Sequence, residues 1–246
     1  MTSITLRPAR LPDERRFYVG MAIVLLAIVL AGFSRSFFLR PLFPDHPSPP
    51  ETVFYWHGAV FTAWFLLLVA QTTLIATGRV AVHRALGRAG GVLAAAMVVL
   101  GCFVALVAGA RKGGFIDVPI PPLSFLIVPL ADMLIFGVLV GVAIAKRHVA
   151  QIHKRLMLIA SISIVAAAVA RLPFDFLATG GPIVFFGVQD LLLVAIVIWD
   201  FASRGRPHPA TLWGSALLIA SQPIRLWVSG TETWLAFAAW AVGIVS

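Results

Sequence analysis

The chain has 246 residues, of which 60% are hydrophobic and only 12% are charged, with a mean hydropathy of +0.98. Soluble domains carry about 25% charged residues, so the composition excludes an ordinary soluble protein and indicates a membrane protein. The net charge of +9 is distributed between apolar runs. We therefore interpret it as an orientation signal and expect no nucleic-acid partner.

The polar segment 1–17 precedes a long apolar run. That run exceeds the apolar stretch of a signal peptide, about 7–15 residues, so we expect it to be retained as a first membrane span. About 20 apolar residues cross a bilayer as a helix, and lipid-exposed backbone must be helical or form a closed barrel. The sequence predicts an all-α polytopic bundle, over 18–229, with spans at 18–39, 53–77, 86–110, 122–145, 156–177, 183–202 and 210–229.

The distribution of cations predicts how the chain is threaded. Thirteen of the 19 Lys and Arg residues fall in one alternating set of segments, and six fall in the other. The positive-inside rule then places segment 1–17 in the cytoplasm and the end of the seventh span outside. The remaining segment, 230–246, is apolar but short, so we expect it to lie at the interface. The single Cys102 leaves no disulfide within the chain.

Two similar stretches each place a histidine beside cations at the predicted cytoplasmic edge: VAVHRALGRAGG (80–91) and VAQIHKRLMLIA (149–160). Neutral imidazole binds metals and haem iron, which makes His83 and His153 candidate ligands of haem b or a metal. The basic residues expected around haem propionates are Arg84, Arg88 and Arg155, and His148 is a possible third ligand for a bare metal. The alternative is that these residues only contact lipid headgroups.

A second candidate site is a layer of ionisable residues in the outer half of the predicted spans. Such residues are costly in lipid and are functional candidates by default. The sequence leaves open a salt-bridge network that fixes helix register, or a pocket open to the periplasm. In the pocket, a histidine or aspartate would handle a proton or ion, and arginines would hold an anionic or carbonyl group. The layer comprises Arg35, His57, Asp132, Arg171, Asp175, Asp190 and Arg225.

Three motifs carry a resemblance to a known group: HGAVFTAWFLLLVAQTTL (57–74), HRALGRAGG (83–91) and HKRLMLIASISIVAAAVARLPFD (153–175). Over residues 18–228 the chain resembles an uncharacterised group of bacterial multi-pass membrane proteins with no established activity. The resemblance implies the bacterial inner (plasma) membrane and motif positions at His57, Gln71, His83, His153 and Arg171. The edge histidines are more loosely similar to those of small haem-b bundles, although no helix carries two histidines at opposite faces.

Three classes of function remain open from the sequence. The first, ranked ahead, is a haem- or metal-binding redox or sensor protein that uses His83 and His153. The second is a proton-coupled small-molecule transporter that uses the outer polar layer. The third is a structural or assembly protein with a membrane-protein partner. No catalytic residue is assigned, and the oligomeric state is left open.

Overall fold

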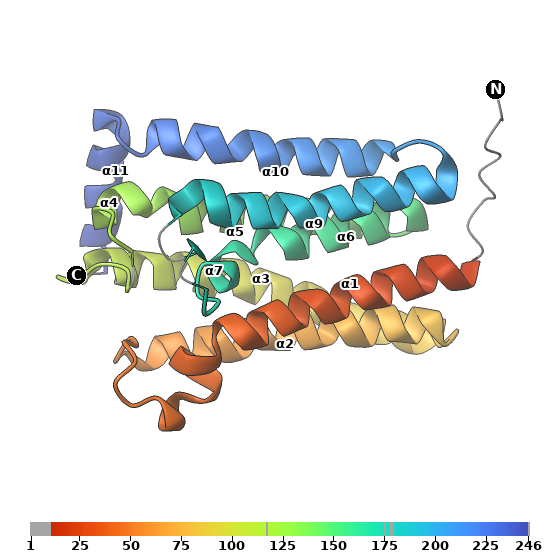
Figure 1. Cartoon of the computed structure of the whole chain (residues 1–246), viewed down its shortest axis with the longest axis horizontal. Helices are drawn as coiled ribbons and strands as arrows, with labels where there is room; N and C mark the ends of the chain where they lie inside the picture. The colour runs from red at the N-terminus through yellow and green to blue at the C-terminus, as the bar shows by residue number, and fades with distance from the viewer. Residues whose placement is uncertain (1–10, 117, 175, 178–179, 246) are drawn as a thin grey trace.

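The computed structural model describes residues 11–116, 118–174, 176–177 and 180–245. Within these residues the chain forms helices joined by loops, and it contains no strand. The predicted all-α class is therefore confirmed for the described part of the chain. Figure 1 shows the long helices lying side by side and running back and forth along one axis.

The helices follow the apolar runs closely. Short stretches of π- and 3-10 helix, Ser34–Phe38 and Arg40–Leu42, extend the first helix. The α-helices are α1 Leu11–Gly32, α2 Thr52–Ala76, α3 Val80–Ala110, α4 Pro122–Phe125, α5 Ile127–Ala145, α6 Ala150–Ser163, α7 Ala166–Val169, α9 Gly181–Arg204, α10 Pro209–Val228 and α11 Glu232–Gly243.

The two ends of the bundle are built differently. At one end, which we call the hairpin end, short turns at 77–79, 146–149 and 205–208 join consecutive helices. Gly205 there adopts a φ of 74°, a left-handed conformation that suits glycine, and its N–H caps α9 by donating to the Phe201 carbonyl at 2.8 Å. At the other end, the cavity end, the connections are long, at 33–51 and 111–121.

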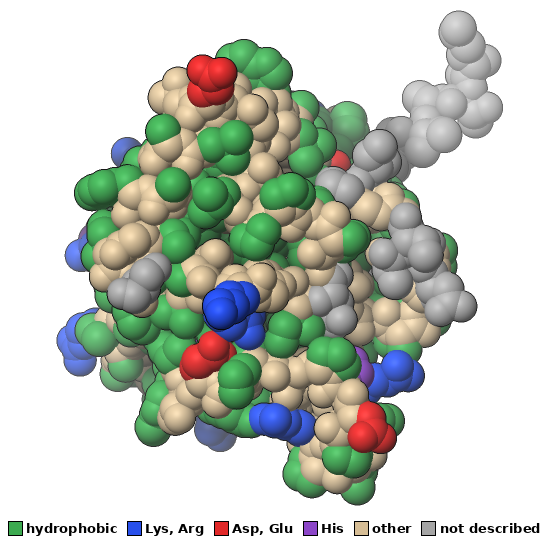
Figure 2. Space-filling model, turned by 90° about the vertical axis from the view of Figure 1, so that its left-hand side faces the viewer, with side chains coloured by type: hydrophobic (Ala, Val, Ile, Leu, Met, Phe, Trp, Pro, Cys, Tyr) green, Lys and Arg blue, Asp and Glu red, His purple; other side chains and the backbone are tan. Residues whose placement is uncertain are grey.

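Apolar side chains fill the interior and also cover much of the outside. Leu25, Phe136 and Ile159 are fully buried in the core, whereas Val99 and Trp227 are 72% and 76% exposed. Apolar surface in water costs about 25 cal/mol per Å², so a bundle that is apolar on both sides is suited to lipid. Figure 2 looks onto the cavity end, where hydrophobic side chains cover much of the face and a basic and an acidic group lie side by side near its centre.

Among the described residues, five helices are long and apolar enough to cross a membrane: Asp13–Gly32, Thr52–Ala76, Val80–Ala110, Pro122–Ala145 and Val184–Arg204. The predicted span 156–177 is instead divided: it begins within the 14-residue α6, which ends at Ser163, and continues after a break as the short α7. The predicted span 210–229 matches α10, which has 20 residues but is made less apolar by polar residues such as Gln222 and Arg225. The seven crossings and the orientation stay predictions.

The last helix closes the cavity end. In Figure 1, α11 lies crosswise to α10 at this end of the bundle. The indole N–H of Trp234 in α11 donates to the Leu123 carbonyl of α4 at 2.9 Å, and Ala238 packs in a small apolar cluster with Ala105 and Leu126. This helix covers most of the segment for which an interfacial position is predicted.

Candidate functional site

The cavity end contains a cavity of about 290 Å³. Its walls come from the extension of α1, from α2, α3, α5 and α7, and from the loops at 47–49 and 115–116. Nine phenylalanines and Tyr55 line it. Pockets for small molecules typically measure about 300–1,000 Å³ and are mostly apolar with a few polar groups, so this cavity lies at the small end of that range.

Helices are interrupted where they border the cavity. α6 ends at Ser163 and α7 begins at Ala166, and both Ile164 and Ala166 line the cavity. The carbonyls of Ile162 and Ser163 accept hydrogen bonds from the Gln189 amide nitrogen of α9, at 2.7 and 3.0 Å. Irregular backbone at membrane depth is tolerated where protein covers it or where it lines a cavity. The break is therefore held in place by a specific partner.

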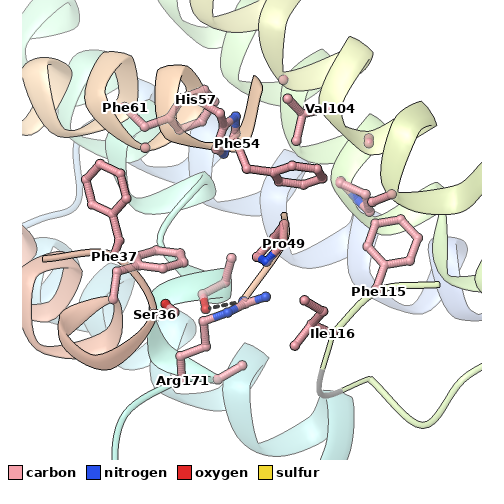
Figure 3. A pocket seen from close by; sticks show the side chains of 18 of the residues that line it. Ser36, Phe37, Pro49, Phe54, His57, Phe61, Val104, Phe115, Ile116 and Arg171 are labelled. Atoms are coloured by element: carbon pink, nitrogen blue, oxygen red, sulfur yellow. Dashed lines mark hydrogen bonds between the residues drawn. The ribbon is translucent and has the colours of Figure 1, made fainter. Parts of the chain in front are cut away.

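His57 lines the cavity from α2, about one turn after that helix begins. Its Nδ1 atom is buried and has no hydrogen-bond partner among the described residues, and its ring packs against Phe61 with centroids 4.0 Å apart. Gly58 lets the Phe37 ring approach, because a Cβ there would lie 2.8 Å from that ring. Figure 3 shows these side chains around the open space.

Arg171 lines the cavity from the segment after α7. Its guanidinium donates to the Ala167 carbonyl at 2.9 Å and lies over the Phe33 ring at 5.3 Å from the centroid. In Figure 3, Arg171 reaches into the cavity from the side opposite His57. A fixed positive group and a buried imidazole thus border the same space.

Asp132 of α5 also lines the cavity, and it forms an ion pair with Arg225 of α10 at 2.5 Å. Arg225 is 2% exposed and also donates to the Ser221 hydroxyl at 3.0 Å. A buried charge needs such a partner, because removing one member leaves the other uncompensated. The pair joins α5 and α10 directly behind the cavity wall.

The cavity unites three of the seven residues in the predicted polar layer: His57, Asp132 and Arg171. Arg225 contacts it only through Asp132. Asp190 accepts a hydrogen bond from the Gln222 amide at 2.8 Å, and Arg35 is exposed, with its guanidinium 5.8 Å from the Phe43 centroid. Asp175 lies outside the described residues.

Two further arginines, which the sequence did not mark as candidates, line the cavity. Arg40 lies over the Tyr55 ring at 5.5 Å. Arg111 lies over the Phe54 ring at 4.9 Å and 3.7 Å from the Glu51 carboxylate. A signal was present in the sequence, because Arg40, Arg111 and Arg171 are three of the six cations that run against the positive-inside distribution.

At the hairpin end, the two predicted histidines come together. The rings of His83 and His153 lie 6.4 Å apart, centroid to centroid, at an angle of 83°. Nδ1 of His153 lies 2.9 Å from the Ala143 carbonyl oxygen. A carbonyl only accepts, so this nitrogen carries a proton.

Gln71 fixes the opposite arrangement at His83. The Gln71 amide forms hydrogen bonds with its neighbours when its nitrogen faces His83. The nitrogen then donates to Nδ1 of His83 at 2.5 Å and to the His83 backbone carbonyl at 3.2 Å. The amide oxygen accepts from the Gly87 N–H at 2.9 Å. Nδ1 of His83 is then the acceptor and Nε2 carries the proton. Nδ1 therefore donates in His153 and accepts in His83.

In this arrangement protein groups already satisfy the two histidines. The lone pair on Nδ1 of His83 accepts from Gln71, so a metal or haem at that nitrogen would have to displace this hydrogen bond. Arg155 is fully buried against Asp200, so it does not extend toward a propionate, and Arg84, Arg88 and His148 are exposed. Among the described residues, no three His, Cys, Asp or Glu side chains are grouped as metal ligands would be.

The Arg155–Asp200 pair is the centre of a polar cluster that the sequence analysis did not predict. Both side chains are 0% exposed. Asp200 also accepts from the Thr211 hydroxyl at 2.5 Å and the His208 N–H at 2.9 Å. Nearby, Lys154 pairs with Glu14. The cluster links α6, α9 and α10 at the hairpin end.

Because comparison with known proteins finds no match, a function can be argued only from the geometry of these two ends. No protein-family model, no curated protein and no solved structure matches the chain. The cavity end is the better candidate site, because several of its polar groups line a space large enough for a small ligand, whereas those of the hairpin end bind one another.

Proposed function

We propose that the protein is a proton-coupled carrier of a small molecule and that the cavity is its substrate site. The observation that carries this proposal is that three membrane-embedded ionisable residues, His57, Asp132 and Arg171, line one cavity. Ionisable residues in such positions mark substrate and proton pathways. The interrupted α6–α7 segment adds support, because carriers build their substrate sites from discontinuous helices.

The proposal includes seven crossings of the bacterial inner membrane. α10 and the α6–α7 pair lie alongside the five apolar helices in Figure 1, and the cation distribution favours a cytoplasmic hairpin end. The cavity then faces the periplasm. Membership of the uncharacterised bacterial multi-pass group stays part of this proposal. Reporters fused to the two termini should lie on opposite sides of the membrane, and reporters on the same side would overturn the seven-span topology.

The two titratable residues have different roles in the proposed cycle. His57, with its buried Nδ1, accepts and releases a proton beside the bound substrate. Asp132 takes up a proton and releases Arg225, and loss of this ion pair loosens the contact between α5 and α10. A carrier needs a helix contact that can adopt two arrangements. The contact between α5 and α10 could do so, because protonation of Asp132 would break its ion pair with Arg225.

Thiol accessibility tests the proposal without knowledge of the substrate. The single native cysteine is changed, Cys102→Ala, and one new cysteine is placed on the cavity wall, Val104→Cys. The matched control is Val99→Cys, on the lipid-facing side of the same helix. Each is treated with a membrane-impermeant anionic methanethiosulfonate from either side of oriented vesicles, with and without a proton gradient.

We expect Val104→Cys to react with the reagent added on the periplasmic side. It should also react from the cytoplasmic side, at a rate that depends on the proton gradient. Val99→Cys should react from neither side. Reaction from one side only, under every gradient, would overturn the carrier and leave a binding or sensor protein. No reaction from either side would overturn the open cavity as well.

A further inference from the structure

Resting on the proposed function, we infer that the cavity binds a small uncharged aromatic molecule that carries one hydrogen-bonding group. The substrate class follows from three features of the wall. These are its aromatic rings, the partners that its charged groups already have, and the imidazole of His57.

Aromatic rings make up much of the cavity wall, and they come from opposite sides of it. Nine phenylalanines and Tyr55 line the cavity. In Figure 3, Phe37 lies on one side, and Phe54 and Phe115 lie on the other. Aromatic rings pack well against other flat rings in offset or edge-to-face geometry, and apolar cavities in proteins bind molecules such as benzene. A flat aromatic ligand therefore makes contacts here that a saturated ligand of the same size does not.

The charged groups of the wall already contact other protein groups. Arg111 lies 3.7 Å from the Glu51 carboxylate, and Asp132 pairs with Arg225. The arginines of the wall also lie over its rings: Arg40 over Tyr55, Arg111 over Phe54 and Arg171 over Phe33. A charged ligand would have to compete with these contacts for a counter-ion, and burying a charge without one is costly. An uncharged ligand leaves the existing contacts in place.

His57 gives the wall a polar group with hydrogen-bonding capacity to spare. Its Nδ1 atom is buried and has no hydrogen-bond partner among the described residues, which is uncommon for a buried polar atom. In Figure 3 its ring borders the open space on the side opposite Arg171. A hydroxyl both donates and accepts, so a ligand hydroxyl suits either tautomer of the imidazole. The same hydrogen bond brings the ligand to the residue that carries the proton in the proposed cycle.

The volume of the cavity limits the ligand to one or two rings. About 290 Å³ is at the lower limit of small-molecule pockets. 2-Naphthol combines two fused flat rings with one hydroxyl, which stays protonated at neutral pH as that of tyrosine does. It is therefore the probe of choice, with its hydroxyl toward His57 and its rings among the phenylalanines.

The test measures binding of 2-naphthol to the purified full-length protein by equilibrium dialysis at neutral pH. The other chamber holds the same detergent without protein, so that uptake by micelles is subtracted. Decahydro-2-naphthol keeps the hydroxyl but is saturated, and 2-naphthoate carries a charge. We expect 2-naphthol to bind saturably and about tenfold more tightly than either. Equal affinity for decahydro-2-naphthol would overturn the aromatic preference, and equal or tighter binding of 2-naphthoate would overturn the uncharged ligand.

Naphthalene, which lacks the hydroxyl, isolates the contribution of His57. We expect 2-naphthol to bind about fivefold more tightly than naphthalene, as one hydrogen bond allows. His57→Leu should remove this ratio, and His57→Gln should keep part of it because an amide still forms hydrogen bonds. The matched control is His148→Leu, since His148 is an exposed histidine at the hairpin end; it should leave the ratio unchanged. A full ratio in His57→Leu would overturn the role of His57.

Thermal unfolding is followed for each variant, and if His57→Leu fails to fold, the loss expected in His57→Gln replaces it. The comparison of probes on the wild-type protein does not depend on any variant. Absence of saturable binding by every probe, with Val104→Cys reactive from both sides, would overturn the inference and leave the carrier proposal standing. Binding as expected, with Val104→Cys reactive from one side only, would support the aromatic site and overturn the carrier.

Discussion

The two ends of the bundle use similar residues for different purposes. At the hairpin end, Arg155 is enclosed by Asp200 and Gln151, and His83 is held by Gln71. At the cavity end, Arg171 and His57 border a space of about 290 Å³. Both ends therefore contain arginine and histidine within the bundle, and those of the cavity end border a volume that a ligand can occupy.

This difference shows that an intramembrane charge is informative only together with its surroundings. A buried ion pair that satisfies its own hydrogen bonds fixes the packing of helices. A charge that lines a cavity marks a pathway or a binding site. The contrast between the two ends can be tested at each of them.

The largest expected effect is at the hairpin end, on folding. Asp200→Ala leaves Arg155 buried without its counter-ion, and breaking such a pair costs about 3–5 kcal/mol. The free energy of unfolding, measured in detergent with a denaturant, should fall by that amount. The double variant Arg155→Met with Asp200→Leu should recover most of the loss, because apolar residues of similar volume replace both charges.

A control for this prediction is the neighbouring Lys154–Glu14 pair, whose side chains are about a fifth exposed. Burial lowers the pKa of Lys154, although Glu14 opposes that shift. Lys154→Ala should cost only about 0–1 kcal/mol, as partly exposed pairs do. An equal loss of unfolding free energy in Lys154→Ala and Asp200→Ala would contradict the prediction that the buried pair contributes more than the partly exposed one.

The next effect is at the cavity end, on binding. Val104→Phe fills part of the cavity, since Val104 is 6% exposed and lines it. Affinity for a small aromatic probe, such as naphthalene, should fall more than tenfold, which corresponds to about 1.4 kcal/mol. Val99→Phe adds the same side chain on the lipid face of α3, where Val99 is 72% exposed, and should leave affinity unchanged. Unaltered binding in Val104→Phe would place the ligand elsewhere.

A third prediction concerns the histidine pair. Because Gln71 holds the proton on Nε2 of His83, protein purified after growth with added haem should show no Soret band. Nitrogen NMR of labelled histidine should report opposite tautomers at His83 and His153. Gln71→Leu removes the hydrogen bonds, at about 1 kcal/mol, and should release the His83 tautomer. A Soret band that disappears in His83→Ala would restore the haem hypothesis.

The smallest effect is a pH dependence at the hairpin end. Burial, together with the charges of Arg155 and Arg204, lowers the pKa of His208 below its ordinary 6.5. Neutral His208 caps α10 by accepting from the Ala210 N–H at 3.0 Å. The unfolded chain binds a proton more readily than the folded one, so this stabilisation is complete above 6.5 and is lost as the pH falls through the lowered pKa.

The capping contribution is about 1 kcal/mol. The expected result is a thermal unfolding temperature that declines in wild type as the pH falls below 6.5 and declines less in His208→Asn, which keeps a capping oxygen but does not titrate in this range. Identical pH profiles for the two proteins would remove His208 as the cause.

The features that could be predicted from the sequence are those that depend on the local pattern of apolar and polar residues. The helices follow the apolar runs, and the pairing of His83 with His153 and the common layer of His57, Asp132 and Arg171 follow from depth along parallel axes. Depth does not specify rotation about a helix axis. For that reason the sequence could not tell that Arg155 points inward to Asp200 while Arg84 points outward.

The break between α6 and α7 was also beyond the sequence. Residues 164–170 are apolar and include four alanines in five positions, 166–170, which is typical of continuous helix. The interruption depends on Gln189, 26 residues away, whose amide bonds the carbonyl of Ser163. A tertiary partner outweighs local propensity here, and the cavity exists in part because of it.

The crosswise α11 has a consequence for local stability. Its side chains pack beside Ala105 and Leu126 and anchor the segment that carries Phe115 and Phe125, two rings of the cavity wall. A short helix held by one indole hydrogen bond and a small apolar cluster opens at a lower free energy than the long helices do. Opening of α11 would therefore release this part of the wall while the long helices stay folded.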